Sequence, residues 1–146
     1  MMSDVLIRVV EWRSNDALRD IRHRVFIEEQ QVPAELEWDA EDAHATHFLL
    51  TLDKQAVGTA RLLPDGHIGR VALLSEARGM GLGQQLMRAV MAHAQRQGMK
   101  RLVLSAQTHA LGFYRQLGFV TYSDVYPEAG IPHQDMRWEP GTSNPG

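Results

Sequence analysis

The stretch that decides the fold is HIGRVALLSEARGMGLG, residues His67–Gly83, in which an apolar run leads into a glycine-rich turn. The run His67–Leu74 is typical of a buried strand, and apolar residues recur at helical spacing after the turn, which predicts a helix over Gly81–Gln97. The first N–H groups of such a helix are unpaired, and its dipole adds partial positive charge there. Glycines let a ligand approach the backbone closely. The stretch therefore predicts a site for a phosphate or pyrophosphate.

The spacing of the glycines distinguishes between three kinds of phosphate-binding turn. A Walker A loop needs a Lys-Ser/Thr pair, and the chain has none. A dinucleotide fingerprint needs G-x-G-x-x-G early in a βαβ unit, whereas these glycines run G-x-G-x-G past the middle of the chain. The pattern Arg/Gln-x-x-Gly-x-Gly/Ala fits, at Arg78, Gly81 and Gly83. Taken alone, the same letters also fit an ordinary tight turn.

A second motif, ALGFYRQLGF, lies downstream at Ala110–Phe119. It follows a short apolar run, Arg101–Ser105, that predicts a buried strand, and it predicts a helix over His109–Leu117 that ends at Gly118. The two motifs, in this order and with about one helix and one strand between them, resemble the hallmarks of the GNAT superfamily of N-acetyltransferases. The resemblance spans about Val5 to Trp138.

Two further segments narrow the resemblance. RHRVFIEEQQVP, Arg22–Pro33, and VYPEAGIPHQDM, Val125–Met136, are similar to the ElaA-like branch of the superfamily. The GNAT fold that the resemblance implies is a mixed, twisted central sheet of six to seven strands. It has helices on both faces and a splayed central V that holds CoA.

The remaining sequence predicts elements that suit this α/β fold. The first helix is expected from an apolar stripe at Leu18, Ile21, Val25 and Phe26. Further strands are expected over Val5–Trp12, His44–Leu52, Gln55–Leu63, Phe119–Val125 and His133–Trp138. The resulting order β-α-β-β-β-α-β-α-β-β is typical of a mixed sheet covered on both faces.

Composition limits the function classes. The 146 residues and 44% apolar side chains fit one domain, residues 1–146, with a core over about 5–138 and a flexible tail over 139–146. A net charge of −3 argues against a nucleic-acid partner, and no apolar run approaches the ~20 residues that span a membrane. The lack of cysteine excludes an acyl-cysteine route and Cys-based zinc sites. We expect no metal, because His44 and His47 would face opposite sides of a strand, and we expect a cytoplasmic protein, because no secretory signal is visible.

The resemblance implies acetyl-CoA as cosubstrate and assigns residues to it. In GNAT proteins the pantetheine arm lies along the central strand, which matches Gly69–Leu74 here, and the pyrophosphate lies at the glycine turn. The implied CoA-binding residues are Val71, Ala72, Leu73, Arg78, Gly79, Met80, Gly81, Leu82, Gly83, Gln84, His109, Phe113 and Tyr114. The guanidinium of Arg78 can pair with a phosphate, although an ordinary solvated position for this side chain stays open.

Acetyl transfer to an amine also needs an acid and a base. In the family, the Tyr of the second motif lies near the CoA sulfur, so Tyr114 is the expected general acid for the departing thiolate. The central strand holds no carboxylate that could serve as the base. His67 at its start and His133, in the segment that contains Glu128, are the candidate bases, since imidazoles titrate near neutral pH. A route in which water removes the proton without a dedicated base stays open.

An acidic stretch predicts the acceptor side of the site. Between Arg24 and Lys54 the chain has no Lys or Arg, and seven acidic residues lie within residues 28–42. If they form an exposed rim, they attract a cationic amine, and Trp38 can stack on its cationic head. The expected acceptor-binding residues are Glu29, Glu37, Trp38 and Arg70. A solvated acidic loop without a role in recognition is the alternative.

The resemblance therefore implies an acetyl-CoA-dependent N-acetyltransferase that acts directly on a primary amine of a small molecule or peptide. A catalytically weak CoA-binding sensor or interaction module on the same fold is the alternative, and a homodimer stays open.

Overall fold

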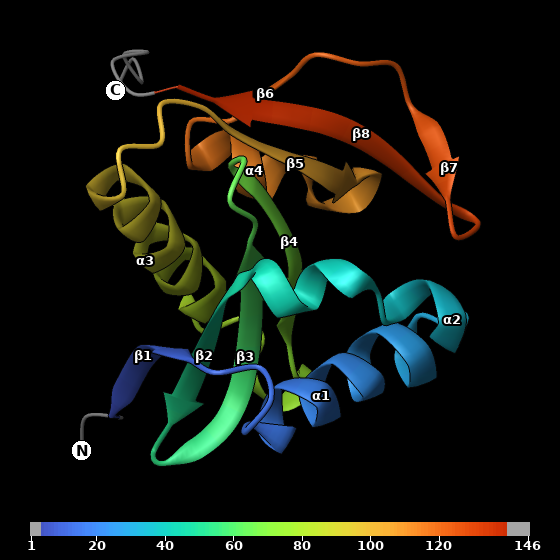
Figure 1. Cartoon of the computed structure of the whole chain (residues 1–146). Helices are drawn as coiled ribbons and strands as arrows, with labels where there is room; N and C mark the ends of the chain where they lie inside the picture. The colour runs from blue at the N-terminus through green and yellow to red at the C-terminus, as the bar shows by residue number, and fades with distance from the viewer. Residues whose placement is uncertain (1–3, 140–146) are drawn as a thin grey trace.

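The computed structural model describes residues 4–139, which form one eight-stranded sheet with helices on both faces (Figure 1). The strand order is β1-β2-β3-β4-β5-β8-β6, and β7 pairs with β8. The strands are β1 Val5–Val10, β2 Thr46–Leu52, β3 Gln55–Leu62, β4 His67–Leu73, β5 Leu102–Gln107, β6 Val120–Thr121, β7 Tyr126–Glu128 and β8 Ile131–Trp138. The helical segments are α1 Asp16–Arg22, η1 His23–Glu29, α2 Ala34–Glu37, η2 Ala40–His44, η3 Ser75–Ala77, α3 Leu82–Arg96, η4 Thr108–Ala110 and α4 Leu111–Gln116.

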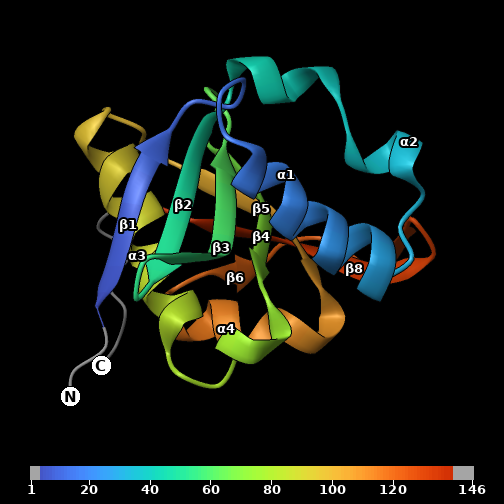
Figure 2. The same ribbon diagram turned by 90° about the horizontal axis from the view of Figure 1, so that it is seen from below.

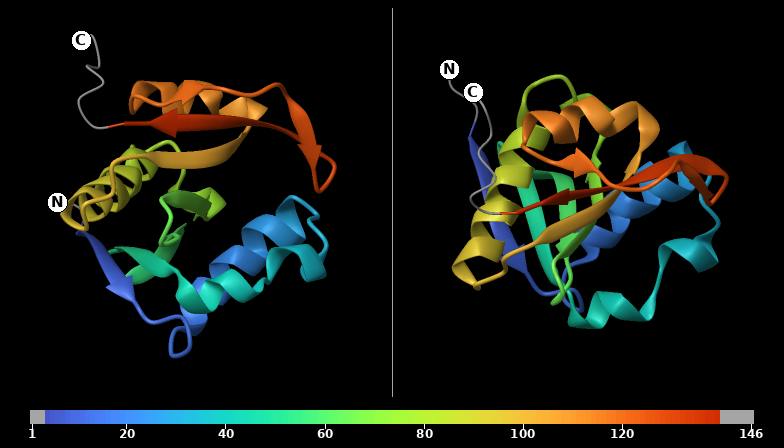
Figure 3. Two further views of the ribbon diagram at one scale, coloured as in Figure 1. Left: turned by 45° about the horizontal axis from the view of Figure 1, so that its top comes forward. Right: turned by 90° about the horizontal axis from the view of Figure 1, so that it is seen from above.

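The sheet divides between β4 and β5. These strands are parallel and pair only at His67 with Val103 and at Ile68 with Leu104. Beyond Ile68, β4 continues antiparallel to β3, while β5 runs antiparallel to β8 over its whole length. Figure 3 shows the two groups of strands leaning apart from this junction. The splayed central V that the resemblance implied is therefore present, and it opens at Gly69.

A β-bulge lies where β4 leaves β5. Thr59 of β3 pairs with Ala72 and Arg61 with Gly69, so that Arg70 and Val71 together lie opposite a single residue, Ala60. Arg70 has φ of 50°, in the left-handed region that L-residues with side chains seldom adopt. A bulge bends its strand and redirects side chains, and strained backbone of this kind concentrates at functional sites.

Helices cover both faces of the sheet and complete the core. Figure 2 shows α1 in front of β3 and β4, with α3 and α4 behind the sheet. The apolar stripe of α1 places Leu18 and Ile21 in the core, and that of α3 places Leu86 and Val90 there, each at most 1% exposed. Burying one such side chain stabilises the fold by about 1.5–3 kcal/mol.

Several element boundaries differ from the expectation. The last part of the chain forms three strands, β6, β7 and β8, instead of two, which gives eight strands where six to seven were expected. Residues 40–44 form the helical turn η2, so that β2 begins at Thr46. The helix expected from His109 opens with the separate turn η4, and the expected tail lies outside the described residues except for Glu139. No helix within residues 4–139 is long and apolar enough to cross a membrane.

Candidate active site

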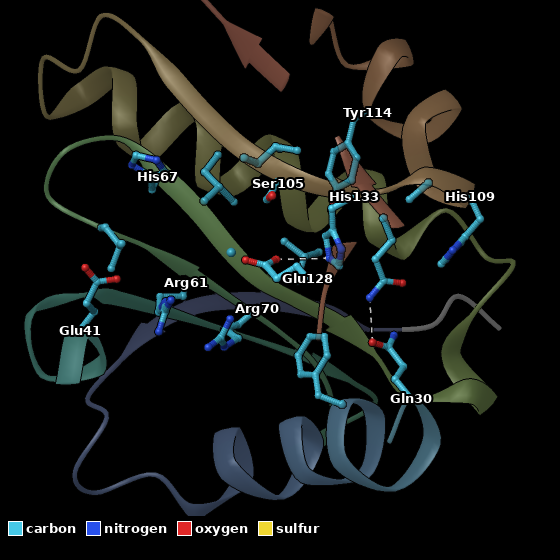
Figure 4. A pocket seen from close by; sticks show the side chains of 18 residues that line it. Gln30, Glu41, Arg61, His67, Arg70, Ser105, His109, Tyr114, Glu128 and His133 are labelled. Atoms are coloured by element: carbon cyan, nitrogen blue, oxygen red, sulfur yellow. Dashed lines mark hydrogen bonds and ion pairs between the residues drawn. The ribbon is translucent and has the colours of Figure 1, made fainter. Parts of the chain in front are cut away.

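A cavity of about 350 Å³ opens in the V between β4 and β5. This volume suits a small ligand group. Its walls include the start of β4, the end of β5, and residues from η1, α4 and the β7–β8 hairpin. Figure 4 shows Tyr114, His133 and Glu128 on one side of it and Arg61, Arg70 and Glu41 on the other. The cavity brings together the three residues expected to be catalytic, which are Tyr114, His67 and His133.

Tyr114 reaches the cavity from α4. Its ring packs edge-on against Phe113 and Phe119, with centroid separations of 5.0 and 6.1 Å. Burial raises the pKa of Tyr114 to about 12. The phenol therefore keeps its proton at any working pH. It is better suited to donating a hydrogen bond to a developing thiolate than to giving its proton up, because an ordinary thiol has a pKa of only about 8.5.

His133 is a buried imidazole with a defined tautomer. Its Nδ1 lies 2.7 Å from the carbonyl oxygen of Ile131, and since a carbonyl can only accept, Nδ1 carries the hydrogen. In the neutral ring Nε2 is then left with its lone pair, 3.5 Å from Oε2 of Glu128. A carboxylate oxygen at this position can accept a hydrogen bond from the nitrogen once the nitrogen carries a proton. His133 and Glu128 thus form a pair that can accept a proton at the cavity.

His67 lies at the opposite end of the cavity wall, at the start of β4. It is exposed, and its Nδ1 lies 3.0 Å from Oδ2 of Asp65 in the turn that precedes the strand. Burial alone would raise the pKa of Asp65, but its bonds with His67 hold that pKa below the usual range. The turn thus positions the imidazole at the protein surface, in contrast to the enclosed ring of His133.

The glycine turn has an open backbone at the beginning of α3. Gly79 and Gly81 have φ of 77° and 76°, and a Cβ at either position would meet no atom within 4 Å. No side chain caps the N-terminus of α3. Gly83 differs, because a Cβ there would lie 3.3 Å from the Phe113 ring. A bulky residue at Gly83 would therefore press on Phe113 and disturb the fold, whereas the space at Gly81 fits the expected approach of a phosphate.

The remaining residues expected to bind CoA surround this turn. Leu73 ends β4 and Met80 is half exposed in the turn, while Leu82 is buried as the first residue of α3. Gln84 donates a hydrogen bond to Gln116 of α4 at 2.8 Å. Three others line the cavity itself: Val71, His109 and Tyr114. Ala72 lies within β4 and its side chain is buried, so only its backbone is available to a ligand.

Arg78 and Glu29, expected to bind phosphate and acceptor respectively, are bonded to each other. Both terminal nitrogens of Arg78 donate to the Glu29 carboxylate at 2.7 Å, and Nε and Nη2 also donate to the carbonyl of Leu73. The hydrogen bond lowers the pKa of Glu29 and raises that of Arg78. Neither is among the residues that line the cavity. The pair joins the end of η1 to the glycine turn.

The expected acidic rim is wrong for its central residues. Glu37 and Asp42 are each only 2% exposed. Arg22 donates to Glu37 at 2.6 Å and to Asp42 at 2.9 Å, and the ring of Trp38 lies 5.1 Å from the Arg22 guanidinium. The stretch lacks basic residues of its own, but Arg22, Arg61 and Arg70 approach it from other elements. The charges of Glu37 and Asp42 are paired inside the fold, so these two residues cannot form a free rim that attracts an amine, whereas Glu35 and Glu41 of the same stretch are exposed.

Some residues of the cavity were not anticipated from the sequence. Arg61 of β3, Ser105 of β5 and Gln107 at the end of β5 all line it. Gln107 donates a hydrogen bond to Gln30 at 2.8 Å, which ties β5 to the residue after η1 (Figure 4). One signal was available: Arg61 interrupts the apolar strand GTARLL, and a buried arginine requires partners. Among residues 4–139, no group of three or more His, Asp and Glu side chains could hold a metal ion.

The splayed sheet, the glycine turn that opens α3 and the tyrosine of α4 beside the cavity define a GNAT acetyltransferase. The chain belongs to this family, because residues 12–140 match the model of the acetyltransferase (GNAT) domain.

Its relatives place it in an ElaA-like branch. It is 34% identical to protein ElaA of Escherichia coli (strain K12) over 84% of this chain and 86% of that protein. The crystal structure of Escherichia coli ElaA superposes with a TM-score of 0.82 at 30% identity and covers 94% of this chain and all of that one. An acyl-CoA N-acyltransferase from Pseudomonas aeruginosa gives a TM-score of 0.81 at 35% identity, covering 93% and 99% of the two chains. The uncharacterized N-acetyltransferase YjcF of Bacillus subtilis (strain 168) is 32% identical over 89% of this chain and 98% of its own.

Proposed function

We propose that this protein is an N-acetyltransferase that uses acetyl-CoA to acetylate a primary amine of a small molecule or peptide directly. The observation that carries the proposal is the single cavity at the V, into which both Tyr114 and the His133–Glu128 pair project. A GNAT family acetyltransferase from Elizabethkingia anophelis, which shares the fold with a TM-score of 0.69 at 18% identity, has acetyl-CoA bound.

The residues present fit CoA. The edge of β4 that faces β5 is unpaired after Ile68, which leaves the backbone N–H groups near Val71 and Leu73 available to a pantetheine arm, whereas the carbonyl of Leu73 already accepts from Arg78. The open space at Gly79 and Gly81 and the uncapped first turn of α3 suit a pyrophosphate. Arg78 can supply charge there only if its bonds to Glu29 rearrange or are shared. Bound acetyl-CoA supplies the activated acetyl group as a thioester.

The chain's own residues have separate tasks in this scheme. Nε2 of His133 accepts the proton of the acceptor amine, and Glu128 stabilises the resulting imidazolium. Because Glu128 is exposed, the proton can leave to water from this pair. Tyr114 donates a hydrogen bond toward the position where thiolate charge develops. The chain contains no cysteine, so no acyl-cysteine can form, and the amine attacks the thioester directly.

The test is thiol release from acetyl-CoA in the presence of a panel of primary amines, together with calorimetric binding of CoA. The proposal requires turnover of at least one amine. The variant His133→Gln should lower that turnover by about 10²–10⁴-fold, the range expected for a general base. His67→Gln, at the exposed end of the cavity, is the matched control and should retain most of the activity.

Binding of CoA without turnover of any amine would instead indicate the sensor or interaction module. Equal losses in both histidine variants would remove the assignment of His133 as the base. A cytoplasmic location and a homodimer remain predictions.

A further inference from the structure

Two arginines form the wall of the cavity opposite His133. Arg61 comes from β3 and Arg70 from the bulge of β4, and both line the cavity (Figure 4). The side chain of Arg61 is 7% exposed and that of Arg70 is 23% exposed. Both bond to Asp39, at 2.8 Å from Arg61 and 3.2 Å from Arg70. The positive charge of two guanidinium groups at the wall of a cleft must be balanced by neighbouring carboxylates or by a ligand.

The carboxylate oxygens of this cluster all face arginine nitrogens. Oδ1 of Asp42 accepts from Arg22 and Arg61, and its Oδ2 accepts from Arg22. The two oxygens of Asp39 are taken by Arg61 and Arg70. Those of Glu37 face Arg22 at 2.6 Å and Nε of Arg70 at 3.2 Å. Five of the six carboxylate oxygens thus already accept a hydrogen bond from an arginine, and the sixth, Oε2 of Glu37, lies 3.2 Å from Nε of Arg70.

On Arg61 and Arg70, the groups without a partner are donors. Nε of Arg61 is buried without a hydrogen-bond partner, and so is Nε of Arg70, whose contact with Glu37 lacks hydrogen-bond geometry. Within residues 4–139, no acceptor bonds to Nη2 of Arg61 or to Nη1 of Arg70. The two buried Nε atoms are closed to a ligand, so Nη2 of Arg61 and Nη1 of Arg70 are the donors that this wall can offer to an acceptor in the cavity.

The charges around Arg70 also favour an anion at this wall. Burial lowers its pKa, Glu37 opposes this, and the neighbouring charges of Arg61 and Arg22 lower it further. An anion at the wall would relieve both the repulsion and the unpaired donors. The pyrophosphate of CoA is expected elsewhere, at the glycine turn beyond the other end of β4. The wall is thus left to the acceptor substrate.

We propose that Arg61 and Arg70 bind a carboxylate of the acceptor, so that the preferred substrate is an aminocarboxylate. This inference rests on the proposed function. The amine of the substrate points toward Nε2 of His133, and its carboxylate lies against the two guanidiniums. A planar carboxylate can accept two parallel hydrogen bonds from one edge of a guanidinium. An ammonium group has no acceptor to offer these donors. A singly charged group is favoured over a phosphate, because Glu41 and Glu128 also line the cavity.

The test compares α-, β- and γ-amino acids with their own carboxamides in the thiol-release assay. Because amidation also changes the basicity of the amine, the readout is the ratio of kcat/KM for acid over amide, compared between wild type and variants. The variant Arg70→Gln should lower this ratio by about 10–100-fold, as expected for losing a charge-assisted hydrogen bond. Arg70→Lys keeps the charge without the fork and should give an intermediate ratio.

Glu41→Gln is the matched control of opposite sign. Its carboxylate lies at the mouth of the same cavity and repels the substrate carboxylate, so its removal should raise the ratio by about two- to fivefold, most at low salt. Cooperative unfolding well above the assay temperature and unchanged CoA binding of each variant show that the fold and the donor site are intact. A merely structural role of Arg70 would lower turnover of acid and amide alike.

An acid-to-amide ratio that is the same in wild type and Arg70→Gln overturns the inference, as does a preference for phosphate-bearing amines. The proposed function survives either outcome, because amines still turn over. If no amine releases thiol although CoA binds, the proposed function fails. Calorimetry of the CoA-bound protein then decides the inference by itself. Tighter binding of the acids than of the amides, lost in Arg70→Gln, supports it, and equal binding overturns it.

Discussion

The buried guanidinium of Arg22 should be the largest single polar contributor to the stability of this protein. The side chain is fully buried, bonds to both Glu37 and Asp42, and lies over the rings of Trp12 and Trp38 at 4.8 and 5.1 Å. The variant Arg22→Met keeps the length of the side chain and removes the charge. Removing one partner of a buried ion pair costs about 3–5 kcal/mol.

The structure favours the lower end of that range for Arg22→Met. Asp42 keeps its bond from Arg61, at 3.0 Å, and Glu37 keeps its ion pair with Arg70, at 3.2 Å. We therefore expect a loss of about 3 kcal/mol, which for a domain of this size corresponds to a fall in Tm of about 6–12 °C.

Urea unfolding at neutral pH measures this loss, and Arg19→Met is the matched control. Arg19 lies one turn earlier on α1, is about one-third exposed, and places its guanidinium 4.3 Å from the ring of Trp12. Its replacement should cost at most about 1 kcal/mol. If Arg22→Met unfolds within 1 kcal/mol of wild type, or costs no more than Arg19→Met, the interpretation of the cluster as an interdependent ion network is refuted.

Three further predictions concern the donor site, the reaction and acid stability. Tyr114→Phe should keep CoA affinity in calorimetry and lower turnover by about 10²–10³-fold, as for the loss of one donor to developing charge, and unchanged turnover would exclude a chemical role for the phenol. Gly81→Val should abolish CoA binding at a folding cost of about 1–2 kcal/mol from its left-handed backbone, whereas wild-type affinity would place the pyrophosphate elsewhere. Burial alone would raise the pKa of Asp42, but its bonds from Arg22 and Arg61 hold that pKa below the usual value. Asp42 therefore stabilises the protein above about pH 4 and loses this contribution as the pH falls through its lowered pKa. The unfolding free energy of Asp42→Asn should accordingly fall less steeply in acid than that of wild type, and parallel curves would contradict this.

The local sequence pattern was sufficient to predict the elements that carry the donor site. The apolar period of α3 runs through Leu82, Leu86 and Val90, all buried in the structure, and the left-handed glycines Gly79 and Gly81 fall where the turn requires them. The strand β4 was also correctly placed, because its apolar run is continuous. Each of these signals comes from residues that are neighbours in sequence and act on the same element.

The acceptor side could not be derived in the same way. The acidic stretch around Glu37 lacks nearby basic residues, so its sequence indicates an exposed loop. Its partners arrive from α1, β3 and β4, which come together only in the folded chain. The bulge at Arg70 was equally hidden, since a non-glycine residue with positive φ leaves no mark in an apolar strand.

The bulge at Arg70 links the opening of the V, which holds the donor side of the site, to the acceptor side. An extra residue in β4 turns the strand away from β5, which opens the V, and the extra residue is Arg70, whose side chain lines the cavity so formed. The strain of its backbone is held by bonds to the carbonyls of Leu36 and Glu37 and to the carboxylate of Asp39. The segment Leu36–Asp39 is itself anchored through Arg22. The buried ion network is therefore part of the acceptor site as well as of the core. Weakening it at Arg22 should disturb the position of Arg70 before it disturbs the glycine turn, which is held through Arg78 and Glu29 on a separate set of contacts.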